Sequence, residues 1–277
     1  MSVIRSIISL LKPFVESHRP IAEAYRAYRD QAALMRTPIE SPWGFRLAGN
    51  TAMARGEFEP VETEYVRALL PDTDVLVNIG ANVGYYCSHA LSMGKQVIAF
   101  EPVQRNLRFL CRNIKINGWH NVEIFPLALS SKTDVLEIYG ADTGASLVKG
   151  WAGISEKHVT LVPTSTLDLV MGGRLSGQRV FVLMDVEGAE LSVLEGATTL
   201  LHQYPRPVWM IEISSFEHQP HGVSVNPNFL RTFKILWEAG YTAFAVDHEM
   251  RQISVVDVEA VQAGDLQRFA THNFLFK

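Results

Sequence analysis

The chain has 277 residues, of which 47% are hydrophobic and 19% are charged, and its formal net charge is −4. This composition is typical of a globular protein and excludes a disordered chain. Without a basic excess, a nucleic-acid partner is not expected. No run of about eighteen apolar residues occurs, so no membrane span is predicted.

The N-terminus and the two cysteines bear on partners and compartment. Residues 1–15 carry apolar side chains at helical spacing, which predicts a helix packed on the domain or on a second subunit of a homodimer. The alternative is a helix that lies on a membrane surface. A signal peptide is not expected, because only Arg5 precedes the apolar stretch. Cys87 and Cys111 fall within predicted helices, so we expect a reducing, cytoplasmic location rather than a disulfide framework.

The order of predicted elements indicates an α/β fold. Residues 1–60 form an N-terminal extension, helical and then irregular, and residues 61–277 form one domain in which apolar runs alternate with amphipathic segments. That alternation predicts a seven-stranded, mostly parallel sheet with helices on both faces. Residues 129–166 form a β insertion after the third strand. The predicted strands are 74–79, 96–100, 122–127, 180–184, 208–213, 241–246 and 273–276, and the predicted helices are 83–93, 104–117, 189–202 and 227–238.

A glycine-rich turn follows the first predicted strand. In VLVNIGANVGYY, residues 75–86, Gly80 permits a tight bend and Gly84 permits close packing of the next helix. The pattern is G-x-x-x-G and lacks the middle glycine of the dinucleotide motif. A dinucleotide needs an open helix N-terminus for its pyrophosphate, whereas S-adenosylmethionine has no phosphate. The turn therefore favours S-adenosylmethionine over NAD.

An acidic residue closes the second predicted strand. Glu101 lies about twenty residues after the glycine turn, where a carboxylate accepts hydrogen bonds from a ribose diol. After the third strand, Leu127 and Ala128 are placed to face an adenine. Both S-adenosylmethionine and NAD contain adenosine, so these residues indicate an adenosine cofactor without choosing between the two.

Polar residues gather where the later strands end. In an open α/β sheet the site lies at the carboxyl ends of the strands, and we predict catalytic roles there for Asp185, Glu187, Glu212 and His218. The alternatives are that Glu187 caps the next helix, Glu212 makes a structural hydrogen bond, and His218 is solvated. Sequence spacing does not establish a divalent metal site. The insertion and residues 38–58 are the expected walls of an acceptor pocket, where Trp151 either packs in the core or stacks on a sugar.

The chain resembles the FkbM family of S-adenosylmethionine-dependent methyltransferases. The matching segments are NIGANVGYY (78–86), AFEPVQRN (99–106), NIKING (113–118), TLD (166–168), MDVEGAELSVLEGA (184–197) and MIEIS (210–214). The resemblance implies a class I methyltransferase (Rossmann-like) fold and methylation of a hydroxyl group on a sugar, glycan or secondary metabolite. The cofactor contacts expected on this basis are Asn78, Gly80, Ala81, Asn82, Gly84, Glu101, Pro102, Asn106, Ala128 and Asp185.

Two positions depart from the family pattern. Asn78 stands where the family usually has an aspartate, and Met184 stands where it commonly has a lysine. The amide at position 78 brings no charge, so we expect weaker cofactor binding. Without a cation at position 184, Asp185 is expected to be less stable as an anion. The alternatives to an O-methyltransferase with a small-molecule or glycan acceptor are an NAD-dependent oxidoreductase and a catalytically silent binding module with a methyltransferase fold.

Overall fold

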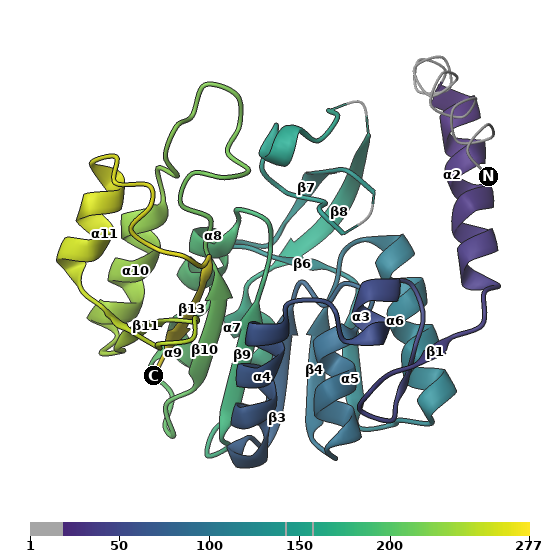
Figure 1. Cartoon of the computed structure of the whole chain (residues 1–277), viewed down its shortest axis with the longest axis horizontal. Coiled ribbons are helices and arrows are strands. Elements are labelled where there is room, and N and C mark those ends of the chain that lie inside the picture. Colours follow the sequence, from purple (N-terminus) through teal and green to yellow (C-terminus); the bar gives the residue numbers. More distant parts are fainter. Residues whose placement is uncertain (1–18, 142, 157) are drawn as a thin grey trace.

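The computed structural model describes residues 19–141, 143–156 and 158–277. Its centre is an eight-stranded sheet of order β12-β11-β13-β10-β9-β3-β4-β5, drawn in Figure 1. Strands β10, β9, β3, β4 and β5 are parallel neighbours, and β13 is antiparallel to both β10 and β11. The strands are β3 (Val75–Ile79), β4 (Gln96–Phe100), β5 (Val122–Phe125), β9 (Val180–Met184), β10 (Val208–Glu212), β11 (Ala243–Ala245), β12 (Gln252–Ile253) and β13 (Asn273–Phe276).

The mostly parallel α/β sheet is confirmed, with one strand more than predicted. The additional strand is β12, which has two residues and pairs antiparallel with β11 at the edge of the sheet. Two residues are too few to show an alternating pattern, so the sequence did not reveal it. The third predicted strand ends early, at Phe125, because Pro126 follows and has no N–H to donate to a strand ladder.

Alternating side chains of the strands point to opposite faces of the sheet. Val75, Val77 and Ile79 of β3 join one buried cluster, and Leu76 joins the cluster on the other face. Both faces are therefore covered by helices, as predicted. The first face is covered by α7 (Leu167–Met171), α8 (Glu190–Glu195), α9 (Thr198–Leu201), α10 (Phe229–Glu238) and α11 (Val255–Gln262), and the second by α4 (Pro60–Leu69), α5 (Tyr85–Ser92) and α6 (Gln104–Asn117).

The predicted helix 189–202 forms two helices, α8 and α9, that are separated at Gly196. A Cβ atom at Gly196 would lie 2.3 Å from the backbone oxygen of Ser130. The chain therefore passes close to the strand β6 region at this point, and the helical path is interrupted. The helices α4, α7 and α11 were not predicted.

The N-terminal extension packs on the domain through its second half. It contains α2 (Arg19–Leu34), which stands beside the main body in Figure 1. After it come β1 (Ile39–Glu40), β2 (Arg46–Leu47) and α3 (Thr51–Arg55). Phe45 and Met53 are buried in one cluster with Tyr85 of α5 and Phe109 of α6. The predicted helix at residues 1–15 lies outside the described residues.

The β insertion forms a small sheet of order β6-β8-β7. Its strands are β6 (Ala128–Leu129), β7 (Asp134–Tyr139) and β8 (Val159–Ser165), and a short 3-10 helix, η2 (Trp151–Gly153), lies between β7 and β8. In Figure 1 this small sheet lies above the upper ends of the strands β9, β3 and β4. The predicted β character of residues 129–166 is confirmed.

Two further findings concern the whole chain. Both cysteines are free, Cys87 buried in α5 and Cys111 exposed on α6. Among the described helices, none combines the length and the apolar character needed to cross a membrane.

Candidate cofactor and active site

Two adjoining cavities lie at the carboxyl ends of the parallel strands. The residues common to both are Gly80, Asn82 and Asp185, so the cavities meet over the turn that follows β3. We call them the adenosine cavity and the acidic cavity. The adenosine cavity is lined, among others, by Phe100, Glu101, Pro102, Val103, Asn106, Leu127, Ala128, Leu129, Ile138, Leu147 and Glu187. The acidic cavity is lined, among others, by Met53, Phe58, Glu59, Asn78, Ala81, Tyr85, Tyr86, Leu183, Met184, Met210, Glu212 and Asn273.

The turn itself requires glycine at position 80. Gly80 has φ +82°, and a Cβ atom there would lie 1.8 Å from the backbone oxygen of Asp185. The backbone N–H groups of Gly80 and Ala81 donate to the carbonyl oxygen of Phe100 at 3.0 and 2.9 Å. The turn is therefore fixed between the ends of β4 and β9, and its backbone borders both cavities.

The second glycine of the motif has a packing role. Gly84 has φ +86°, and a Cβ atom there would lie 2.4 Å from Cδ1 of Leu110 on α6. Gly84 is not among the residues that line either cavity. Of the predicted cofactor contacts, it is the one that the structure places away from the site; the close approach that it permits is between two helices.

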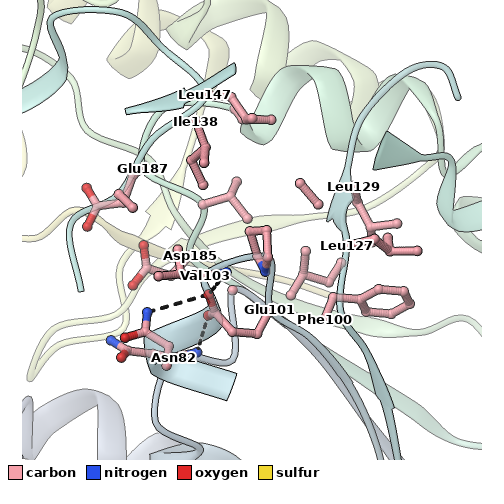
Figure 2. A pocket seen from close by; sticks show the side chains of 18 of the residues that line it. Asn82, Phe100, Glu101, Val103, Leu127, Leu129, Ile138, Leu147, Asp185 and Glu187 are labelled. Carbon is pink, nitrogen blue, oxygen red and sulfur yellow. Dashed lines mark hydrogen bonds between the residues drawn. The ribbon is translucent and has the colours of Figure 1, made fainter. Parts of the chain in front are cut away.

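Glu101 organises the adenosine cavity. Its Oε2 accepts a hydrogen bond from the backbone N–H of Asn82 at 2.7 Å, and its Oε1 accepts one from the backbone N–H of Val103 at 2.7 Å, with the Asn106 amide 3.5 Å away. These contacts are drawn in Figure 2. Burial raises the pKa of Glu101 to about 7. Each carboxylate oxygen has two lone pairs. Oε1 already accepts from Val103 and Asn106, whereas Oε2 accepts from Asn82 alone and keeps acceptor capacity for a ribose hydroxyl group.

The opposite wall of the adenosine cavity is apolar. Figure 2 shows Phe100, Leu127 and Leu129 on the side away from Asp185, with Ile138 and Leu147 of the insertion above. Phe100 stacks on Phe125 with ring centroids 5.1 Å apart, which fixes its position. Ala128 and Pro102 complete this wall. The cavity therefore has an apolar wall opposite the carboxylate of Glu101.

The turn also presents an unsatisfied polar atom. Oδ1 of Asn82 is buried and has no hydrogen-bond partner among the described residues, and Asn82 has φ +51°. A buried acceptor without a donor carries a desolvation penalty that a ligand can remove. Together with the bare backbone at Gly80 and the split between polar and apolar walls, this atom shows that the site fits S-adenosylmethionine.

Strand alternation explains the composition of the acidic cavity. Met210 and Glu212 of β10, and Leu183 of β9, point to the same face of the sheet as Asn78 of β3. Asn78, Leu183 and Met210 are register partners at one level of the sheet, and Glu212 lies two residues nearer the carboxyl edge. Asn273, opposite Glu212 in the antiparallel pair with β13, extends the same row.

Asn78 is buried and engaged by its neighbours. Its Nδ2 lies 3.5 Å from the carbonyl oxygen of Leu183, and its Oδ1 accepts from the thiol of Cys87 at 3.3 Å. Burial raises the pKa of Cys87 to about 12, so the thiol stays protonated and remains a donor. The amide thus satisfies one donor and one acceptor at once, which a carboxylate does not do.

Asp185 lies where the two cavities meet. Its backbone N–H donates to the carbonyl oxygen of Ile79 at 3.0 Å, and its carboxylate has no hydrogen bond or ion pair within the described chain. Burial, followed by the charges of Glu212 and Glu187, raises the pKa of Asp185 well above its usual range. Burial, followed by the charge of Glu59, raises the pKa of Glu212 to about 8.

Glu187 is held in place by the insertion. Its Oε2 accepts from Nε1 of Trp151 at 2.7 Å, and its backbone oxygen accepts from the hydroxyl of Ser146 at 2.6 Å. Glu187 does not cap the next helix, because the N-cap of α8 is Ala189; the N–H of Gly188 donates to Oε1 of Glu190 at 2.8 Å. Trp151 is only 3% exposed, so it orients Glu187 and offers no open ring face to a sugar.

The remaining predicted residue lies apart from this group. His218 is exposed, lines neither cavity, and has its ring centroid 6.0 Å from that of Trp151. Within the part of the chain that the structure describes, no three His, Cys, Asp or Glu side chains are grouped to hold a metal ion.

Sequence reasoning missed three contributors to the site. Glu59 precedes the first predicted strand and carries no motif. Asn273 starts β13, and because that strand is antiparallel its first residue lies at the same edge as the carboxyl ends of the others, which is a signal that was available. Ile138 belongs to the insertion, whose wall-forming role was predicted without naming residues.

The model of the methyltransferase FkbM domain matches residues 78–243. No curated protein matches the chain.

Among solved structures, the chain is similar to precorrin-6y C5,15-methyltransferase from Geobacter metallireducens GS-15, at 13% identity and a TM-score of 0.40, over 83% of this chain and 91% of that chain. It is also similar to an rRNA methylase from Streptococcus thermophilus, at 11% identity and a TM-score of 0.38, over 78% and 91%. A third similar structure is fibrillarin from Aeropyrum pernix with S-adenosyl-L-methionine bound, at 12% identity and a TM-score of 0.41, over 77% and 73%. Because the family model spans more than half of the chain, from the end of β3 into β11, the chain belongs to the FkbM family of S-adenosylmethionine-dependent methyltransferases.

Proposed function

We propose that this methyltransferase acts on a hydroxyl group of a sugar, a glycan or a secondary metabolite, and that Asp185 accepts the proton of that hydroxyl. The observation that carries the proposal is the position of Asp185. Its carboxylate faces both cavities and has no partner within the described residues. A group with this access and no structural contact is available for proton transfer.

The chemistry of a hydroxyl acceptor explains why such a carboxylate is needed. When bound, S-adenosylmethionine supplies a methyl group on a sulfonium, which is already activated for in-line displacement. As the new carbon–oxygen bond forms and the carbon–sulfur bond breaks, the hydroxyl must lose its proton. Burial and the neighbouring Glu212 raise the pKa of Asp185. The ionised form is therefore a stronger base than an ordinary aspartate.

The residues that would hold the cofactor follow from the walls of the adenosine cavity. Glu101 accepts hydrogen bonds from the ribose, and Asn82 Oδ1 offers the buried acceptor described above. Phe100 and Leu127 contact the adenine. Glu187, fixed by Trp151, forms the wall on the acceptor side. In this proposal it shapes the pocket and does not move a proton.

The proposal is tested with purified protein in two steps. Calorimetric titration with S-adenosylhomocysteine and with NAD first establishes the cofactor, and we expect binding of the former alone. Methyl transfer is then followed on a panel of free sugars, oligosaccharides and phenolic or polyketide alcohols, with an amine and a thiol panel as controls. Turnover confined to amines or thiols, or cofactor binding without turnover on any hydroxyl, would contradict the proposal.

A further inference from the structure

Glu59 occupies a backbone conformation that side-chain-bearing residues rarely adopt. It lies immediately before Pro60, at the N-cap of α4, with φ 42° and ψ 63°. Its side chain makes no capping hydrogen bond to the helix. A left-handed conformation at a non-glycine residue costs free energy and persists where the surroundings impose it, often at functional sites. Capping of α4 therefore does not explain why a glutamate stands at position 59.

The side chain of Glu59 is directed into the acidic cavity. The hydroxyl of Tyr86 donates to its Oε2 at 2.6 Å, and burial together with the charge of Glu59 raises the pKa of Tyr86 well above its usual value, which keeps that donor protonated. Oε1 of Glu59 has no hydrogen-bond partner among the described residues. One oxygen is thus anchored and the other remains available as an acceptor beside Asn78.

The arrangement of the two cavities decides which part of the cofactor reaches Glu59. The adenosine cavity and the acidic cavity share Gly80, Asn82 and Asp185. A long ligand whose adenosine lies against Glu101 therefore passes over this turn, and its amino-acid end enters the acidic cavity. That end carries an ammonium group, which has three N–H donors and needs acceptors and negative charge.

We propose that Glu59 binds the ammonium group of the amino-acid portion of S-adenosylmethionine, supplying the charge that the amide of Asn78 does not bring. The inference rests on the proposed cofactor site and assigns a binding role to a residue outside the stretch that the family model matches. Among the acidic residues that line this cavity, Glu59 has its carboxylate oriented by a hydrogen bond. The carboxylates of Asp185 and Glu212 have no hydrogen-bond partner among the described residues.

Two ligands isolate the ammonium interaction. S-adenosylhomocysteine carries the amino-acid portion, and 5′-methylthioadenosine has the same adenosine and a neutral sulfur without it. Isothermal titration of both is carried out on the full-length wild type, Glu59→Gln and Glu64→Gln. Glu64 lies on α4, is exposed and lines neither cavity, so it serves as the matched control.

We expect Glu59→Gln to weaken S-adenosylhomocysteine binding at least tenfold and to leave 5′-methylthioadenosine binding within twofold of wild type. Glu64→Gln should change neither affinity. Tyr86→Phe, which removes the anchor of Glu59, should weaken S-adenosylhomocysteine binding by a smaller factor. Glu59→Gly keeps the left-handed backbone without strain, so it should fold at least as well as wild type and still show the selective loss.

The opposing results are equally specific. Wild-type affinity for S-adenosylhomocysteine in Glu59→Gln overturns the inference, as does an equal loss for both ligands. A selective loss in Glu212→Gln with Glu59→Gln unaffected also overturns it. If the wild-type protein binds neither ligand, the proposed cofactor site fails and this inference falls with it. If it binds both and Glu59→Gln is silent, only the inference falls.

Discussion

A Cβ atom on Gly80 would lie 1.8 Å from the backbone oxygen of Asp185. The glycine turn after β3 and the acidic loop after β9 are therefore in direct backbone contact. The first borders both cavities, and the second carries the proposed base. This contact ties the position of Asp185 to the bend at which the two cavities meet.

Gly80→Ala is predicted to abolish binding of S-adenosylhomocysteine and to lower the free energy of unfolding by at least about 2 kcal/mol, because the new methyl group meets backbone and φ is in the left-handed region. Urea unfolding and calorimetric titration measure both effects. Gly94→Ala is the matched control, because Gly94 also has a positive φ but has open space around its Cβ position. Normal binding of S-adenosylhomocysteine by the Gly80→Ala variant would show that the turn has another conformation.

Glu101→Ala is predicted to weaken S-adenosylhomocysteine binding by about 1–3 kcal/mol, the scale of hydrogen bonds to a charged group. The substitution also leaves the N–H groups of Asn82 and Val103 without their acceptor, so a parallel loss of stability is expected. Titration calorimetry checks the affinity. The exposed carboxylate of Glu137 provides a control at Glu137→Ala. Unchanged affinity in the Glu101 variant would show that this carboxylate does not bind the ribose.

Asp185→Asn is predicted to lower turnover on a hydroxyl acceptor about 10²–10⁴-fold, the usual contribution of a general base. Because the buried carboxyl group is raised in pKa by burial and by Glu212, the neutral amide should leave the fold intact and make it no less stable at neutral pH. Single-turnover kinetics and thermal unfolding report the two properties. Wild-type rates in a folded Asp185→Asn enzyme would exclude Asp185 as the base.

The stability of the ligand-free protein is predicted to fall as pH rises from about 5 to about 9. The folded-state pKa of Glu212 is about 8, raised from 4.5 chiefly by burial and by the charge of Glu59, whose own pKa is raised to about 7. A carboxyl group with a raised folded pKa contributes stability that is fully present below its unfolded pKa and is lost as pH rises through the folded one. Further carboxyl groups around Glu212 add negative charge, namely those of Asp185, Glu187, Glu190 and Glu62.

Glu212→Gln should flatten this pH dependence and stabilise the protein at high pH by about 1–2 kcal/mol. Urea unfolding at a series of pH values measures the effect, with the exposed Glu238→Gln as the control. A Glu212→Gln variant whose pH profile parallels wild type would mean that this carboxyl group is not titrating differently in the folded state.

Asn78→Asp is predicted to destabilise the ligand-free protein by about 1–3 kcal/mol, with the larger loss at high pH. The sequence alone suggested that restoring an acid here would tighten cofactor binding. The structure gives a reason to expect otherwise, because Nδ2 of Asn78 faces the carbonyl oxygen of Leu183 and three further acids, Glu59, Asp185 and Glu212, line the same cavity. Thermal unfolding at two pH values tests this, and a more stable aspartate variant would contradict it.

Much of the fold was predictable because the periodic pattern of apolar residues is a local property of the sequence. The helix 104–117 and the strands 96–100 and 180–184 match their predicted bounds, since each combines a clear apolar pattern with a glycine, proline or polar stop. Gly118 ends α6 with φ 69°, as expected for a left-handed C-cap. The short elements β12, α7 and α11 were missed because too few residues carry their pattern.

The candidate site was predictable to the extent that strand order places motifs at one edge. Gly80, Glu101 and Asp185 come directly after β3, β4 and β9, which are neighbours in the parallel sheet. Their proximity was therefore predictable from the fold class, whereas the positions of Glu59 and Trp151 were not. Their contacts to Tyr86 and Glu187 join segments separated by 27 and 36 residues, and no local pattern encodes such a pairing.

The sequence by itself therefore determined the family, the parallel sheet and the glycine turn with its partner Glu101, because these depend on local periodicity and on short motifs. Only the tertiary structure decided that Gly84 packs against a helix, that Trp151 holds Glu187, and that Glu59 faces the cavity beside Asn78. These relationships depend on which surfaces meet when helices and loops pack on the sheet, and that packing is a property of the whole chain.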